Sequence, residues 1–320
     1  MGFFVAAIAA AAISWYVWVH PPTIVKPDPA VFVTATLPAE QVPAREPVAP
    51  KGTPQDYLAQ ARLLLARGDV AGALQVFALG VGADPGDAAM RSAYGLALLR
   101  AGSSDEAVRQ LQQATRLSPQ DVTYHADLAR ALIDLARPRE AIAAYEAALA
   151  ADPKCLDALR GLAELHNRSG DAAGASKALA YATRALELAP NDLILQQQLG
   201  YALDKSGDST KAATIYQAVL DRAPDAAVTR SLLGELLFRQ GKKDEAIALM
   251  KTGLERDPKA PLLHRSLGHL LEEAGRIDEA VAQYREYAAL APNTPDSKQM
   301  GDRASALERT RRPPARQQDS

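Results

Sequence analysis

The chain has 320 residues, a formal net charge of -2 and a hydrophobic fraction of 48%, and aromatic residues make up only 5%. This composition, rich in Ala and Leu, favours helices over sheets, and the near-neutral charge supplies no broad basic surface for a nucleic-acid backbone. The one cysteine, Cys155, excludes an internal disulfide and a cysteine-based zinc site.

Residues 2–19 read GFFVAAIAAAAISWYVWV, an apolar run without charge. At helical rise this run spans about 27 Å, against a hydrocarbon core of about 30 Å. Trp15, Tyr16 and Trp18 lie at its end, where aromatic rings favour the headgroup level, and two prolines follow. We predict a transmembrane anchor over residues 1–20. A cleaved signal peptide is the alternative, although no Lys or Arg precedes the run and no small-x-small site follows it.

Residues 21–53 are rich in proline, as in PAREPVAPKGTP. Proline removes backbone donors and favours extended conformations, so this segment is predicted to be a semi-rigid spacer. It would hold the folded part of the chain away from the membrane.

A regular repeat follows the spacer. Its prolines stand at positions 85, 119, 153, 190, 224, 258 and 292, so the gaps are 34, 34, 37, 34, 34 and 34 residues. A period this regular indicates a repeat architecture.

Small residues recur within each repeat. Ten residues after the prolines come Gly95, Ala129, Ala163, Gly200, Gly234 and Gly268. Seventeen residues after them come Gly102, Ala136, Gly170, Gly207, Gly241 and Gly275. The first set lets two antiparallel helices approach closely, and the second set suits a left-handed residue that ends the first helix.

The second helix of each repeat is indicated by apolar residues four apart. These pairs are Ala107 with Leu111, Ala141 with Tyr145, Ala212 with Tyr216, Ala246 with Met250, and Ala280 with Tyr284. The spacing marks one face of a helix. The same pattern, projected backwards, finds Ala61, Gly68, Ala73 and Phe77 in an earlier repeat.

The small-residue, alanine, aromatic and proline positions together resemble the tetratricopeptide repeat. The resemblance implies an all-α, right-handed solenoid of about seven helix-turn-helix units over residues 54–294. The units are 54–87, 88–121, 122–155, 156–192, 193–226, 227–260 and 261–294. Met300, Ala304 and Leu307 form an apolar stripe that predicts a capping helix over 295–312, and residues 313–320 are predicted to be a disordered tail.

The fourth repeat departs from the pattern. Three extra residues lie between Gly170 and Pro190, and Ala178, Ala182 and Ala185 take the second-helix positions. We expect a looser joint or a bulged turn there.

Catalysis has no candidate residues in the sequence. No metal-binding His pair, nucleophile motif or phosphate-binding glycine loop is apparent. His264 and His269 are five residues apart, on different sides of a helix, and are expected to have surface or groove roles. We therefore predict a protein that is not an enzyme and that has no cofactor, metal or small-molecule substrate.

Function is then expected on the inner surface, which in this family is lined mainly by the first helices. The inward positions, seven and eleven residues after each proline, include Ser92, Leu96, Ala126 and Ser231. The predicted peptide-binding groove consists of Arg130, Arg160, Glu164, Gln197, Tyr201, Glu235, Phe238, Arg265 and His269. Arg130 and Arg160 would bind a carboxylate or an acidic peptide, because a guanidinium donates paired hydrogen bonds. Solvated helix-surface charges are the alternative.

The order of anchor, spacer and repeats resembles bacterial inner-membrane repeat proteins. It predicts a membrane-tethered scaffold that binds other proteins and helps to assemble an envelope complex, in secretion, pilus, polysaccharide or cytochrome maturation. The alternative is a cleaved, exported adaptor or chaperone. The repeats are predicted to face the periplasm, which the spacer suits, whereas the charge bias around the span weakly favours the cytoplasm.

Overall fold

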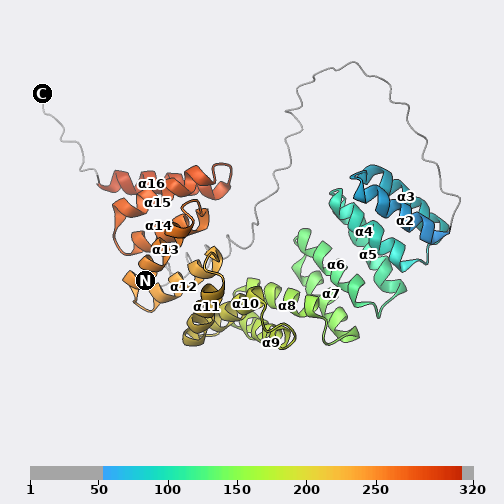
Figure 1. The fold of residues 1–320 in the computed structure, drawn as a ribbon, viewed down its shortest axis with the longest axis horizontal. Helices are drawn as coiled ribbons and strands as arrows, with labels where there is room; N and C mark the ends of the chain where they lie inside the picture. Colours follow the sequence, from blue (N-terminus) through green and yellow to red (C-terminus); the bar gives the residue numbers. More distant parts are fainter. Residues whose placement is uncertain (1–52, 312–320) are drawn as a thin grey trace, which may run out of the picture. The chain divides into compact units, whose positions relative to one another are not determined.

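The computed structural model describes residues 53–311, which are folded into fifteen α-helices, α2 to α16, without a strand (Figure 1). Within this range no helix is both long and apolar enough to span a bilayer. The predicted anchor, nearly all of the predicted spacer and the predicted tail lie outside the described residues.

The helices alternate between the first and second members of successive pairs. The first helices are α2 (Pro54–Ala66), α4 (Ala88–Arg100), α6 (Val122–Asp134), α8 (Leu156–Ser169), α10 (Leu193–Lys205), α12 (Ala227–Arg239) and α14 (Pro261–Glu273). The second helices are α3 (Val70–Ala83), α5 (Ser104–Leu117), α7 (Pro138–Ala151), α9 (Ala172–Leu188), α11 (Ser209–Arg222), α13 (Lys243–Arg256) and α15 (Ile277–Leu290), and α16 (Pro295–Arg311) follows them.

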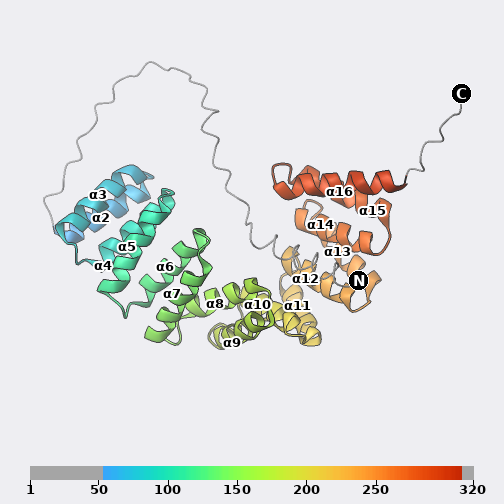
Figure 2. The same ribbon diagram turned by 180° about the vertical axis from the view of Figure 1, so that it is seen from behind.

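The described residues divide into two compact units, and the division falls inside α8. The N-terminal unit comprises residues 53–165 and the C-terminal unit comprises residues 166–311. Paired helices pack side by side within a unit, for example α6 with α7 and α14 with α15, and Figure 2 shows the same pairs from behind.

Helix ends follow the local sequence. Asp69, Asp87 and Asp192 each precede a helix and accept hydrogen bonds from its first backbone N–H groups, at 2.8–3.1 Å. The predicted left-handed residue ends six of the first helices as glycine, with φ between 72° and 97°. After α4, for instance, Gly102 N donates to Leu99 O at 3.0 Å, which satisfies one of the carbonyls that the helix end leaves open.

Ala136 occupies the same left-handed position after α6, with φ of 55°. It is the one non-glycine residue with a positive φ within residues 53–311. Its Cβ sits close to the following backbone in this conformation, so the turn is strained where the other repeats have glycine.

The small residues of the first helices face the second helices, as predicted. A Cβ on Gly95 would lie 2.7 Å from Leu111 Cγ, and one on Gly268 would lie 2.6 Å from Tyr284 Cε1. Both facing side chains are fully buried. Glycine at these positions therefore allows a large side chain of the second helix to pack against the backbone of the first.

The fourth repeat accommodates its extra residues by lengthening a helix. The second helix α9 has 17 residues, whereas α11 has 14. Gly170, with φ of 72°, precedes it as a left-handed glycine precedes most other second helices, and Asp171 is its N-cap. The expected bulged turn is therefore absent, because three more residues add almost one full helical turn and the alanine face stays buried.

The predicted apolar stripe of α16 packs against the core of α12 to α15. Met300 and Ala304 are buried in this cluster, and Leu307 is partly buried beside them. His264 also differs from expectation, because it is buried rather than exposed and bonds to Pro258 O and Gln283 Oε1 at 2.9 and 2.8 Å.

Candidate functional site

Side chains link neighbouring first helices directly within each unit. In the N-terminal unit, Ser92 Oγ donates to Asp127 Oδ2 at 3.4 Å. In the C-terminal unit, Thr229 Oγ1 donates to Gln197 Oε1 at 2.8 Å, and the Ser231 and Ser266 hydroxyls are bonded. Ser92, Gln197 and Ser231 each lie seven residues after a repeat proline, and we call the side of the first helices that carries this position the inner face. Its positions are 4, 7, 11, 14 and 15 residues after each repeat proline, and for α2 they are counted from residue 51, which lies one 34-residue period before Pro85. Helical periodicity places these positions on one side.

Arg130 is the most exposed predicted site residue of the N-terminal unit. Its Nη2 donates to Asp127 Oδ1 at 2.5 Å, and the two side chains are 56% and 5% exposed. Burial raises the pKa of the Asp127 carboxyl, although the hydrogen bond from Arg130 opposes the increase. Arg130 thus has a structural partner as well as an exposed guanidinium. Arg160 and Glu164 are partly exposed on α8.

Two exposed arginines, Arg62 on α2 and Arg100 on α4, also lie on this inner face. Neither has a hydrogen bond or ion pair with any residue in the described range. Leu96 on α4 holds the position that Arg62 holds on α2 and Arg130 holds on α6, and it is 37% exposed. The N-terminal unit therefore presents an aliphatic side chain between basic groups.

The inner face of the C-terminal unit carries four carboxylates, of which those of Asp204 and Glu272 are paired. Asp204 accepts two bonds from Arg239 Nη2 at 2.7 and 2.6 Å. Glu272 is bonded to Arg303 and accepts from the Tyr284 hydroxyl at 2.7 Å. Burial opposes ionisation of Glu272, but the hydrogen bonds from Arg303 and Tyr284 leave its pKa below the ordinary value.

Arg265, a predicted site residue, is engaged in a similar pair. Its Nη1 lies 2.5 Å from Asp296 Oδ2, and the side chains are 12% and 18% exposed. The Tyr287 hydroxyl donates to the same oxygen at 2.8 Å. Because this pair joins α14 to α16, Arg265 contributes to attachment of the last helix.

Glu235 differs from the paired carboxylates Asp204 and Glu272. It is partly exposed and has no hydrogen bond or ion pair within residues 53–311. Burial raises the pKa of its carboxyl, and the charges of Arg239, Arg265 and Lys205 only partly offset that effect. An unpaired carboxylate that has lost part of its hydration is costly to the fold.

The remaining predicted residues have varied environments. Tyr201 is partly exposed, with Lys205 Nζ 5.2 Å from its ring centroid. His269 Nδ1 lies 3.0 Å from the Tyr284 hydroxyl, and burial lowers the pKa of the imidazole. Phe238 is buried in the cluster of α12 to α16, so its ring belongs to the core.

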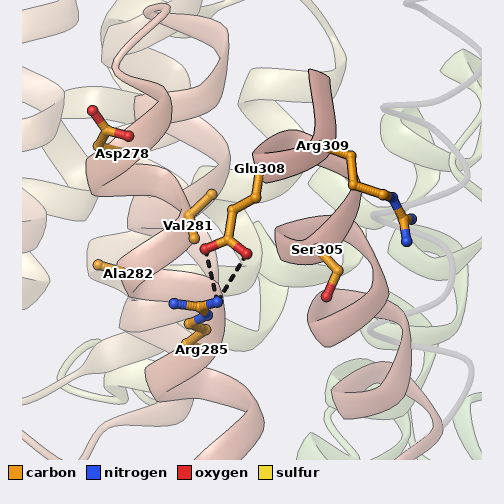
Figure 3. A pocket seen from close by; sticks show the side chains of 7 residues that line it. All are labelled: Asp278, Val281, Ala282, Arg285, Ser305, Glu308 and Arg309. Atoms are coloured by element: carbon orange, nitrogen blue, oxygen red, sulfur yellow. Dashed lines mark hydrogen bonds and ion pairs between the residues drawn. The ribbon is translucent and has the colours of Figure 1, made fainter. Parts of the chain in front are cut away.

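A pocket of about 670 Å³ lies between α15 and α16 (Figure 3). It is lined by Asp278, Val281, Ala282, Arg285, Ser305, Glu308 and Arg309. Glu308 and Arg285 form an ion pair of 2.7 Å inside it, and Figure 3 shows Arg309 pointing away from that pair. The two central charges satisfy each other, so we do not assign a ligand to this pocket.

Metal-binding groups of three or more His, Cys, Asp or Glu residues do not occur within residues 53–311. The important residues that sequence analysis missed are the partners of the predicted ones, chiefly Asp127, Asp204 and Asp296. Asp127 had a recognisable signal, since a carboxylate in a helix position flanked by buried apolar residues needs a partner.

The paired helices and their small-residue contacts define an all-helical repeat protein. The family model described as tetratricopeptide repeat matches residues 58–122, 126–192, 197–261 and 231–295, so the chain belongs to the tetratricopeptide-repeat family. Proteins of this family are typically non-enzymatic scaffolds that bind other proteins or peptides. No curated protein matches the chain.

Solved structures share the fold at low sequence identity. A tetratricopeptide repeat protein from Parabacteroides merdae ATCC 43184 is 15% identical, with a TM-score of 0.65 over 79% of this chain and 98% of that chain. One chain in the structure of the APC/C hetero-tetramer Cut9–Hcn1 is 19% identical, with a TM-score of 0.53 over 78% of this chain and 55% of that chain. These similarities support the helical-repeat fold of the chain.

Proposed function

We propose that this protein is a membrane-tethered scaffold whose inner faces bind segments of partner proteins and help to assemble an envelope complex. The observation that carries the proposal is the position of three side chains on first helices, where Leu96 and Arg130 are exposed and Tyr201 is partly exposed. Their mixture of aliphatic, aromatic and guanidinium groups is typical of surfaces that bind proteins.

Site-specific photo-crosslinking in cells tests this binding role. A photoreactive amino acid replaces Leu96 or Tyr201 on the inner faces, and Arg116 or Thr214, exposed on second helices, provides the control positions. We expect partner adducts from the inner positions and few from the controls. Equal adducts from both sets, or none from the inner positions, would contradict an inner-face scaffold.

The tether is supported by the apolar sequence of residues 2–19, which is long enough to cross a bilayer. We propose that the repeats lie in the periplasm, beyond the Pro-rich segment. The array would span residues 54–294, and the cap would span residues 295–312. The alternative is a cleaved, exported adaptor, because an apolar N-terminal run also directs secretion.

Carbonate extraction separates these two forms. The full-length protein should stay in the membrane pellet, and a variant lacking residues 2–19 should be released into the supernatant. Release of the full-length protein, or a mature N-terminus downstream of residue 19, would favour the exported adaptor. Protease access from the periplasmic side of spheroplasts then tests the orientation of the repeats.

A further inference from the structure

The inner faces of the two units differ in charge. At the five inner-face positions of α2, α4 and α6, the charged residues are Arg62, Arg100, Arg130 and Asp134. At the same positions of α10, α12 and α14, the charged residues are Asp204, Lys205, Glu235, Arg239, Arg265, Glu272 and Glu273. The first surface has an excess of positive charge, whereas the second has a small excess of negative charge.

Internal pairing leaves part of the positive charge of the N-terminal unit available. Arg130 is bonded to the buried carboxylate of Asp127, which offsets one guanidinium. Arg62 and Arg100 are exposed, and neither forms an ion pair or hydrogen bond with residues 53–311. Their donors are therefore directed to solvent, where a partner carboxylate can accept two parallel hydrogen bonds from a guanidinium.

The aliphatic part of this surface lies among the arginines. α4 lies against both α2 and α6, so Leu96 falls between Arg62 and Arg130, which hold the equivalent position on those helices. Packed helices are separated by about 8–10 Å, which brings all three side chains within the span of one short peptide. Leu65, Leu99 and Ile133 are partly exposed on the same face and extend its apolar floor.

We infer that the inner face of α2, α4 and α6 binds an acidic protein segment, which covers Leu96 with an aliphatic side chain and places carboxylates on Arg62 and Arg100. The inference rests on the proposed scaffold function and specifies the partner chemistry of one surface. Basic segments are disfavoured there, because they would bring like charges together beside an apolar floor that excludes water.

Selection from a random 12-residue phage-displayed peptide library tests the inference on the purified repeat-containing chain, held in detergent if the anchor is retained. The wild-type protein should enrich peptides with more Asp and Glu than Lys and Arg and with at least one aliphatic residue. For the most enriched peptide, fluorescence anisotropy should show at least tenfold weaker binding to the Arg62→Glu/Arg100→Glu variant. Affinity for the wild type should also fall between 50 and 300 mM NaCl.

Two further variants test whether a loss of binding comes from this surface rather than from a general change of charge or fold. Arg116→Glu/Arg139→Glu makes the same charge change on the second helices α5 and α7, where both arginines are exposed, and should leave peptide binding unchanged. Leu96→Asp should weaken binding without loss of helical circular dichroism, since Leu96 lies outside the core.

Enrichment of basic or neutral peptides, no enrichment at all, or equal loss in the control variant would overturn the inference. The crosslinking of partners through Leu96 and Tyr201 is a separate result. Partners that remain crosslinked in Arg62→Glu/Arg100→Glu would therefore refute the acidic specificity and leave the scaffold function standing.

Discussion

Replacement of Ala136 by glycine should stabilise the N-terminal unit. Ala136 has φ of 55°, and its side chain is exposed, so the substitution removes no core contact. The turn is held by backbone bonds from Ala136 N to Ile133 O and from Arg137 N to Leu132 O, both 2.9 Å, which glycine retains. The change therefore acts on the backbone conformation alone.

The magnitude follows from two opposing terms. A left-handed conformation costs an L-residue about 1–2 kcal/mol. Replacement by glycine removes this cost, but it also increases the conformational entropy of the unfolded chain, which lowers stability by about 0.4–1 kcal/mol. The midpoints of the two ranges leave a net stabilisation of about 0.8 kcal/mol, which corresponds to an increase of about 2–4 °C in melting temperature for a unit of this size.

Urea denaturation followed by circular dichroism and differential scanning calorimetry measures this change. Gly102→Ala is the matched control, because Gly102 has φ of 78° at the equivalent turn and a Cβ added there meets no atom within 4 Å. It should lower stability by about 1 kcal/mol. A neutral or destabilising Ala136→Gly, together with a destabilising Gly102→Ala, would refute the attribution of strain to Ala136.

Three further predictions concern the C-terminal unit. Glu235→Gln should raise stability by about 1 kcal/mol at pH 7, since it removes an unpaired and partly desolvated charge. The raised pKa of Glu235 means that the wild type loses stability as pH rises through that pKa, so in thermal melts the advantage of Glu235→Gln should grow from pH 4 to pH 7. A constant advantage would exclude this cause. Gly268→Val should cost about 2 kcal/mol through overpacking in urea titrations, whereas Gly301→Ala, where a Cβ meets nothing within 4 Å, should be neutral or stabilising. Arg265→Ala should cost about 3 kcal/mol because it leaves Asp296 partly buried without its cation, and proteolysis should then release α16 first; unchanged protection would contradict that role.

The repeat architecture was predictable because several independent spacings agree. Gly95 and Gly102 mark helix contact and helix end within one repeat, and local chemistry determines both. The lengthened α9 was not predicted, because three extra residues are compatible with a loop or with another helical turn. Only the buried alanine face, which continues through Ala175 and Ala178, distinguishes these alternatives.

The positions on the inner faces were easier to predict than the ion pairs and the exposure of the residues that occupy them. Spacing places Arg130 and Arg265 on the inner faces, but it does not reveal that Asp127 and Asp296 hold their guanidinium groups. Such partners come from the same helix or from the next repeat, and their geometry depends on how the helices pack. Arg62 and Arg100 stay unpaired within residues 53–311 because the folded chain brings no carboxylate next to them, and the spacing of the sequence does not show this either.

The pairing of Arg130 with Asp127 has a thermodynamic consequence for any ligand at this position. A partner carboxylate that draws Arg130 away leaves Asp127 with only the Ser92 hydroxyl, so the affinity of that carboxylate for a proton increases. Ligand binding and proton uptake then become linked equilibria, and the affinity contributed by Arg130 should increase as pH falls. An acidified environment would thereby release this guanidinium from its internal partner for use in recognition.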